Sequence, residues 1–599
     1  MPAKSPADIS DATLRLTIKS EGSPIKDYYP VVSVNITHEL NKISYAEIII
    51  TDGTVEASDF PISESSDLIP GNKIEITAGY GSDAEVSIFK GLIVKQGIRI
   101  TEGEAYALVV TCKHKAVTMC YNKTEEQFTN KTDSAIISSI TGNYGLSATV
   151  DSTTPVPEVT FQKLATDWDF ILARADYNGF VISSDGDDIT IGKPKVDGAA
   201  VLRVAFGESI LSFDAELSAE KQPTALQVSS WDIKNQTLLK SKATEPTLNT
   251  QGNLTAKALS GKLSQKELNL TSNTPLTKDD LTAWADASLL KLRLAALKGK
   301  VSFLGNATVK PNTIIELAGV GDRFNGNAYV TMVNHVLENG TWTTKVKFGL
   351  DTKFAYEQQN FSYPDALGQL PAIKGLQVAT VKKLFDDPDS QFRILITLPS
   401  NAENQDGIWA RMANFHATNK AGAGFLPEIG DEVVIGFLES DPRYPVILGS
   451  LYSSTAKPAA TIPGDNNNYI KTIITKSKLK ITFDDEKKIL KLETPGANMI
   501  TCSDDAKSIE IVDQHTNSIK MNSSGITIQS PKDIILDAKG KITLSAVQNI
   551  ELTAKMDVKT SGLNINNNAN IGFVAKGAAT AELSASGQTT VKGAIVMIN

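Results

Sequence analysis

The 599-residue chain has few cysteines, few histidines and no long hydrophobic run. Three cysteines exclude a small secreted scaffold built on disulfides. No apolar run approaches the roughly 18 residues that a membrane-spanning helix needs. The first twenty residues also lack the apolar core of a signal peptide. We therefore expect a protein that is synthesised in the cytoplasm without a signal peptide, and that leaves the cell, if it does, by another route.

The composition gives little indication of a metal site, a cofactor site or a nucleic-acid-binding surface. The five histidines are His38, His114, His335, His416 and His515, and their scatter excludes a local HxH or HExxH metal site. The net charge of −9 does not fit a nucleic-acid-binding surface. We predict no cofactor, no metal and no catalytic residue. Hydrophobic residues at 41% and charged residues at 21% are ordinary for a globular chain, and its length predicts three to five domains.

Alternating and β-branched runs separated by Gly, Asp and Ser dominate the first part of the chain. They predict a first β domain over 1–125 and a second over 201–355, with a helix-containing insertion over 126–200. Helices are expected at 133–145, 166–180 and 277–298. Thr166 is the expected cap of the second helix, with Asn178-Gly179 as its end.

A compact module of about 80 residues follows between two linkers. The linkers are 356–372 and 453–468, both polar and interrupted by proline and glycine. The module, 373–452, contains five short apolar runs that fit a small OB-like barrel.

From 469 to 599 aromatic residues nearly vanish, and apolar residues recur every eight positions. This octad predicts a β-solenoid in which each repeat supplies one strand and one polar corner. One chain supplies only a narrow face per repeat, so three chains wound together would enclose a core. An ordinary β-meander is the alternative. The predicted core residues are Ile526, Ile528, Ile534, Leu536, Ile542, Leu544, Ile550, Leu552 and Val558.

The order of the expected domains and several short sequence motifs both resemble those of a known family. The motifs are the strings IPGNKIEITAGYG with IFKGLIV, ATDWDFILARADYNGF, FNGNAYVTMVNHVLENGTWTT, WARM and GFLPEIGDEVVIGFLESDPRYPVILGSLY. The chain thereby resembles the VgrG-like spike of contractile injection systems. The same architecture occurs in the hub and spike of contractile phage tails. The last two strings together form the most specific motif. Its residues have expected structural roles in turns and strands, with Trp409 in the barrel core: Trp409, Pro427, Gly430, Asp431, Glu432, Asp441, Pro442, Pro445 and Gly449.

The resemblance implies a mainly β fold: two barrel-like hub domains with inserted helices, an OB barrel and an intertwined trimeric β-helix. It implies a non-enzymatic homotrimeric spike that joins inner-tube, hub and baseplate proteins to a membrane-piercing needle. Such a spike belongs to an injection particle delivered or released outside the cell, and it meets the target envelope during injection. A PAAR-like tip protein and cargo effectors are further expected partners. The residues expected to bind the tip protein are Ala594, Ile595, Val596, Met597 and Ile598.

Two other functions fit parts of the sequence. A trimeric tail-fibre-like adhesin would use the β-helix to bind a receptor, but such proteins usually carry a globular head. A β-helical polysaccharide-degrading enzyme would need acids and aromatics in a cleft, whereas this repeat is short and poor in aromatics.

A few residues carry chemistry that these functions do not use. Cys112, His114 and Cys120 share strand parity, so a metal site, a disulfide and simple burial in a β core are all open. Asp167 and Asp169 could form a catalytic acid pair, but their place in a first helical turn favours capping. The glycine-rich segment 319–326 lacks the ending of a phosphate loop and reads as a β-turn.

Overall fold

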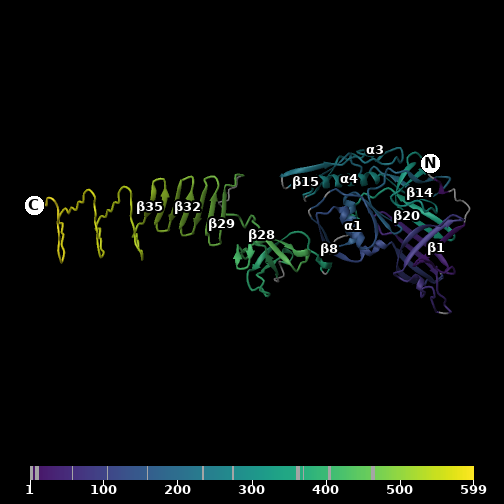
Figure 1. Ribbon diagram of the computed structural model, residues 1–599, viewed down its shortest axis with the longest axis horizontal. Coiled ribbons are helices and arrows are strands. Elements are labelled where there is room, and N and C mark those ends of the chain that lie inside the picture. The colour runs from purple at the N-terminus through teal and green to yellow at the C-terminus, as the bar shows by residue number, and fades with distance from the viewer. Residues whose placement is uncertain are drawn as a thin grey trace. The chain divides into compact units, whose positions relative to one another are not determined.

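The structure is a computed structural model (Figure 1). It describes residues 4–6, 13–56, 58–103, 105–154, 156–157, 159–232, 235–272, 275–358, 365–368, 370–401, 407–459 and 466–598. The chain divides into two compact units, Met1–Ser450 and Leu451–Asn599, which are described separately. No helix in the described part of the chain combines the length and apolar character required to cross a membrane.

A 13-stranded, mostly antiparallel sheet forms the framework of the first unit. Its main path runs in the order β14-β18-β21-β20-β3-β4-β7-β6-β5-β1-β2, and β19 joins β13 to β20. The strands from the N-terminal region are β1 (Leu14–Ser20), β2 (Ser23–Pro24), β3 (Val31–Glu39), β4 (Tyr45–Thr51), β5 (Lys73–Tyr80), β6 (Val86–Arg99) and β7 (Ala107–Lys113). Those from the later region are β13 (Ala200–Ala205), β14 (Ile210–Leu217), β18 (Leu297–Leu304), β19 (Ile314–Ala318), β20 (Gly326–Glu338) and β21 (Thr341–Phe348).

The two predicted β domains share this sheet. β3 and β20 pair over seven residues, from Met332 opposite Glu39 to Glu338 opposite Ser33. Each region still has its own core, one around Ile36, Ile48 and Phe89 and the other around Phe303 and Phe348. Strand periodicity predicts that these runs are strands, but it does not indicate pairing across some 300 residues of sequence.

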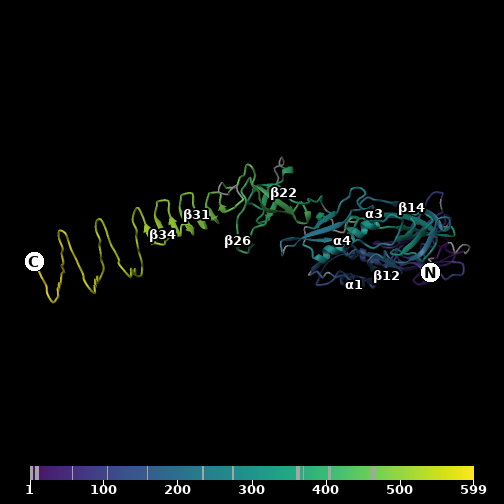
Figure 2. The same ribbon diagram turned by 90° about the horizontal axis from the view of Figure 1, so that it is seen from above.

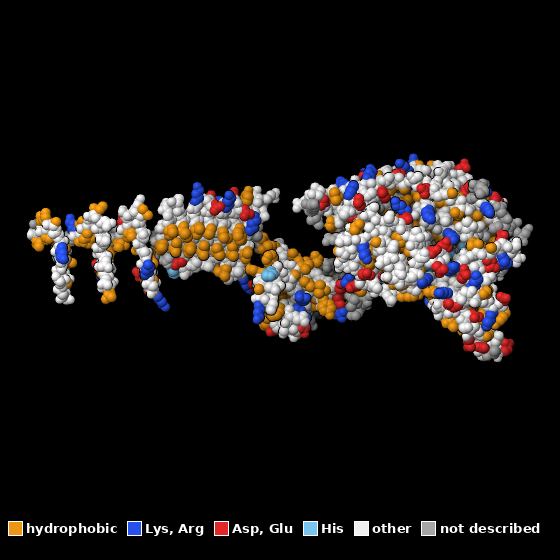
Figure 3. Space-filling model, viewed as in Figure 1, with side chains coloured by type: hydrophobic (Ala, Val, Ile, Leu, Met, Phe, Trp, Pro, Cys, Tyr) orange, Lys and Arg blue, Asp and Glu red, His pale blue; other side chains and the backbone are white. Residues whose placement is uncertain are grey.

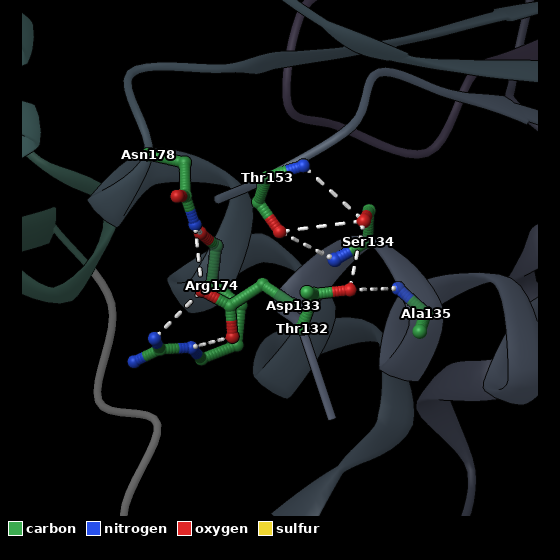
Figure 4. Close-up of polar contacts among 7 residues, drawn as sticks. All are labelled: Thr132, Asp133, Ser134, Ala135, Thr153, Arg174 and Asn178. Atoms are coloured by element: carbon green, nitrogen blue, oxygen red, sulfur yellow. Dashed lines mark hydrogen bonds and ion pairs between the residues drawn. The ribbon is translucent and has the colours of Figure 1, made fainter. Parts of the chain in front are cut away.

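The predicted insertion contains two helices and five strands. The helices are α1 (Asp133–Asn143) and α2 (Asp167–Tyr177), and the strands are β8 (Lys123–Thr129), β9 (Ser147–Val150), β10 (Val159–Thr166), β11 (Val181–Asp185) and β12 (Asp188–Gly192). Thr166 caps α2 as predicted, since its hydroxyl accepts a hydrogen bond from the Asp169 amide. Arg174 of α2 donates two hydrogen bonds of 2.7 and 2.8 Å to Asp133 of α1, and Asn178 donates a third (Figure 4).

The long helix α4 (Lys278–Leu294) packs on a small sheet of order β16-β15-β17. These strands are β15 (Leu226–Asp232), β16 (Thr237–Lys242) and β17 (Leu268–Ser272), and the short helices α3 (Ala256–Leu259) and α5 (Ala355–Gln358) complete the region. Thr277 and Asp280 form a capping box at the start of α4. Leu281, Ala285 and Leu289 face Leu226 and Val228, and this apolar contact holds the helix on the sheet.

The OB module is a closed five-stranded barrel of order β22-β23-β24-β28-β27. Its strands are β22 (Gln377–Lys383), β23 (Ile394–Thr397), β24 (Ile408–Met412), β27 (Glu432–Phe437) and β28 (Pro445–Ser450), and β25 (Ala417–Thr418) and β26 (Ala421–Gly422) form a hairpin. Eight residues fill the interior: Ala379, Val381, Ile394, Ile396, Ala410, Val433, Ile435 and Ile447. The prediction that Trp409 fills this core is wrong. Side chains alternate along β24, so Ala410 points inward and Trp409, its neighbour, lies half-buried on the other side.

The second unit begins with seven antiparallel strands, each paired with the next (Figures 1 and 2). They are β29 (Ile470–Ile474), β30 (Lys480–Asp484), β31 (Ile489–Glu493), β32 (Met499–Ser503), β33 (Ser508–Val512), β34 (Ser518–Asn522) and β35 (Gly525–Gln529). The octad prediction for 469–599 therefore needs a correction. Strand starts up to β34 are nine or ten residues apart, because tight hairpin turns alternate with slightly longer ones.

The eight-residue period appears in the backbone after β35. The described residues 530–598 contain no strand, and the chain runs as a zigzag (Figures 1 and 2). It bends at 531–532, 539–540, 547–548, 555–556, 563, 570–571, 578–579, 586–587 and 594–595. Extended arms separated by regularly spaced corners fit the predicted β-solenoid repeat of one strand and one corner.

Candidate functional site

One face of the seven-stranded meander is apolar. The register places Ile481 opposite Ile473 on one side and Leu492 on the other, and the column continues through further cross-strand pairs. Two such columns run along the face. The first is Ile473, Ile481, Leu492, Ile500, Ile511, Ile519 and Ile528; the second is Phe483, Leu490, Cys502, Ile509, Met521 and Ile526.

This apolar face is open to solvent in the single chain. Most of its large side chains are between 36% and 48% exposed, and Ile526 and Ile528 of the last strand reach 70% and 57%. Figure 3 shows the face as a continuous orange stripe along β29–β35. An exposed patch of this length marks an interaction surface.

The opposite face of the meander carries charged and polar side chains along its middle, and the partly buried Ile470, Ile474, Ile489, Met499 and Val512 lie at the strand ends of the same face. Lys480 and Lys491 both contact Glu493, at 3.3 and 2.8 Å, and Lys520 lies 3.5 Å from Glu510. The hydrogen bond from Lys491 is the main cause of the lowered pKa of Glu493. The middle of the opposite face is therefore suited to water, whereas the apolar face is suited to a core.

The apolar columns continue in the octad segment. Ile534, Ile542 and Ile550 stand three residues after successive bends, and each is 53% exposed. Leu536, Leu544 and Leu552 stand two residues further and are 65–72% exposed. The predicted core residues thus share one side of the repeat, although the single chain covers none of them.

The residues predicted to bind a tip protein are also uncovered. Ile595, Met597 and Ile598 are 82–90% exposed and Val596 is 50% exposed. They follow the bend at 594–595.

The predicted barrel motif shapes the turns around β27 and β28. The Asp431 carboxylate accepts the Glu428 amide at 2.8 Å, and Gly430 has φ +93°, a conformation that suits glycine. Asp441 accepts hydrogen bonds from the Arg443 amide and guanidinium, and the guanidinium bond is the main cause of its lowered pKa. β27 pairs Phe437 with Pro445 and Val434 with Gly449.

The other residues singled out in the sequence have structural partners. Asp167 accepts hydrogen bonds from Thr124, Tyr144 and Gln162, whereas Asp169 lies in the capped first turn of α2. Cys112 and Cys120 are free thiols, and burial raises their pKa values to about 12 and about 11. Within the described residues, no group of three His, Cys, Asp or Glu side chains could hold a metal ion.

The apolar face of 470–522 is the functional feature that sequence reasoning missed. The signal for it is a pair of apolar residues two positions apart in successive runs, as in Ile481 with Phe483, Leu490 with Leu492 and Ile509 with Ile511. Those pairs recur at nine or ten residues, so a search for an eight-residue step passes over them.

Two family models match the chain. Residues 377–452, which contain the closed barrel, match the type VI secretion system/phage-baseplate injector OB domain. Residues 10–339, more than half of the chain, match the Alg8 N-terminal domain, and the chain belongs to that family.

Curated relatives are VgrG proteins. The actin cross-linking toxin VgrG1 of Vibrio cholerae is 33% identical over 102 residues, which are 16% of this chain and 9% of the relative. The type VI secretion system spike protein VgrG3 of the same species is 28% identical over 100 residues, 16% of this chain and 10% of the relative. The match thus spans about a tenth of each relative. The predicted resemblance to VgrG-like spikes is confirmed, as is the mainly β fold with its closed barrel.

Solved structures similar to this chain include tail and secretion proteins. The prophage MuSo2 43 kDa tail protein from Shewanella oneidensis has a TM-score of 0.42 and 11% identity, and the match covers 57% of this chain and 99% of that one. The E. coli c3393 protein, a type VI secretion component, has a TM-score of 0.37 and 12% identity, with 72% and 99% covered. The assignment comes from the family models and the curated relatives.

Proposed function

We propose that this chain is the structural spike of a contractile injection system and that three copies assemble through the apolar face of residues 470–598. The observation that carries the proposal is that face, which continues from the meander into the octad segment and follows an injector OB domain in the sequence. Burying a large aliphatic side chain contributes about 1.5–3 kcal/mol. Two columns of such residues therefore supply ample free energy for assembly.

The arrangement explains why the needle needs more than one chain. In the meander each copy offers one sheet, and three sheets facing a common axis enclose a core. In the octad segment each copy offers one extended arm per repeat, and three arms close each layer. The first mode buries the apolar face of the meander, and the second pairs strand edges that would otherwise be open to aggregation.

The hub domains would join the inner tube and baseplate to this needle, which would pierce a target envelope when the particle contracts. Its role is mechanical, and we assign no catalytic activity to it. The particle would act outside the producing cell.

A PAAR-like protein would cover the apolar residues 594–598, and cargo effectors could travel with it. A pull-down of the full chain with such a tip protein tests this part of the proposal. Binding should be lost when residues 590–599 are deleted, and unchanged binding would exclude the tip role of this segment.

The solution mass tests the assembly. Three chains of 64.3 kDa give about 193 kDa by light scattering, and a particle of 64.3 kDa would contradict the proposal. Ile542→Asp places a charge in an apolar column and should weaken the trimer, so that monomers appear on dilution. Lys541→Asp is the matched control, because this neighbouring side chain points to the other side of the strand, and it should leave the trimer intact.

A further inference from the structure

The octad segment contains one repeat that differs from the rest. Successive bends elsewhere in the segment begin eight residues apart. From the bend at 555 to the bend at 570, however, two repeats span fifteen residues instead of sixteen. The apolar column shows the same shortening. Ile565 follows Val558 after seven residues, and its exposure of 52% matches the 53% of Ile534, Ile542 and Ile550.

The second column becomes polar at the same place. Leu536, Leu544 and Leu552 stand two residues after the isoleucines of the first column, and the next two members by the same rule are Thr560 and Asn567. Leu583 and Val591 restore an apolar column afterwards. Two consecutive polar positions, next to Val558 and Ile565 of the first column, therefore interrupt an otherwise apolar second column.

A uniform octad has a weakness that such a layer removes. If every layer is alike, one chain can slide by a whole repeat past its neighbours and still place apolar residues against apolar residues. A polar layer in a repetitive core makes the shifted alignments unfavourable, because Thr and Asn would then meet apolar layers and lose polar partners.

We propose that the short repeat 558–565, with Thr560 and Asn567, sets the axial alignment of the three chains in the needle. This inference rests on the proposed trimer. In the aligned trimer the three Thr560 side chains share one layer and the three Asn567 side chains the next, so that hydroxyl and amide groups can satisfy one another near the axis. Any shift by one repeat separates them.

The test uses full-length protein with a cysteine reporter. Leu552→Cys places three thiols in one inward-facing layer, which can form an inter-chain disulfide only when the chains are aligned. The reporter is placed in a Cys502→Ser protein, because Cys502 also lies in an inward-facing column and could form its own inter-chain disulfide. It is then oxidised in three backgrounds: otherwise unchanged, Thr560→Val/Asn567→Val, and Lys559→Val/Asn566→Val. The last pair is the matched control, since it makes two polar-to-apolar changes in the same repeats on the opposite side of the strand.

Light scattering first establishes that each protein is a trimer. We expect trimers in all three backgrounds. In the first and third, one disulfide per trimer should join two of the three chains, and the yield of this cross-linked pair should be lower by about twofold or more in the Thr560→Val/Asn567→Val protein. An equally cross-linked trimer would overturn the alignment role while leaving the proposed function intact. Failure of the double valine protein to assemble would also overturn it, because apolar residues in an apolar column should favour assembly. A monomeric parent protein would instead refute the trimer itself.

Discussion

At the scale of single residues, the contact between Gly305 and Trp342 fixes part of the hub. Trp342 is 3% exposed and stacks on Tyr80 with ring centroids 5.6 Å apart. A Cβ on Gly305 would lie 2.0 Å from the indole ring, so Gly305→Ala forces the ring to move. We expect a loss of about 1–3 kcal/mol in unfolding free energy, measured by tryptophan fluorescence in urea. Gly97→Ala, where nothing lies within 4 Å, is the control and should change stability little.

Three histidines make the hub sensitive to acid: His114 and His335, which are buried, and His38, which is partly buried. Burial lowers the pKa of His114 to about 4, that of His335 to about 3, and that of His38 below its usual value. The folded state therefore disfavours protonation. The stability that these neutral histidines contribute to the folded state is fully present above about pH 6.5, near the pKa of histidine in the unfolded chain. It is lost as the pH falls from there towards the lower pKa values of the folded state. For His114 and His335 the loss is about 1.4 kcal/mol per pH unit between these pKa values, so the melting temperature should fall between pH 7 and pH 5.

His335→Gln separates this effect from general acid denaturation. The variant removes a titrating group that accepts the Trp342 indole at 3.3 Å and contacts Thr344, both of which an amide can replace. Its melting temperature should fall less steeply with acid than that of the unchanged protein. Parallel curves would show that His335 does not contribute to the pH dependence.

At the scale of elements, the ion pair between α1 and α2 holds the helices in register. The side chain of Asp133 is 4% exposed and accepts both the Arg174 fork and Asn178 (Figure 4). Asp133→Asn leaves Arg174 without its carboxylate and should destabilise the hub by about 3–5 kcal/mol in chemical unfolding. Glu125→Gln is the control. It breaks the exposed pair with Lys163 and should cost less than about 1 kcal/mol.

The same elements show what could be predicted from sequence. The caps of α2 and α4, the β runs of the hub and the five strands of the barrel follow from local patterns, because capping and side-chain alternation act within a few residues. The pairing of β3 with β20 and the contact of Arg174 with Asp133 do not, because each joins segments whose proximity depends on the rest of the fold. The orientation of Trp409 could not be predicted correctly either. A strand was expected there, but Ala410, one residue further along, is the side chain that points into the barrel.

At the scale of the whole molecule, the two parts of the second unit would contribute differently to the proposed trimer. The meander already satisfies its backbone within one chain and needs partners only for its apolar face, whereas the octad arms of the described residues 530–598 have no strand pairing until other chains supply it. A protein ending near 529 should therefore still form trimers through the apolar face of β29–β35. These trimers should dissociate at higher protein concentrations than trimers of the full chain. A protein ending near 455 lacks both parts and should be monomeric. Light scattering over a dilution series measures this difference. A trimer that persists after removal of both segments would place the main contact in the hub or barrel instead of the needle.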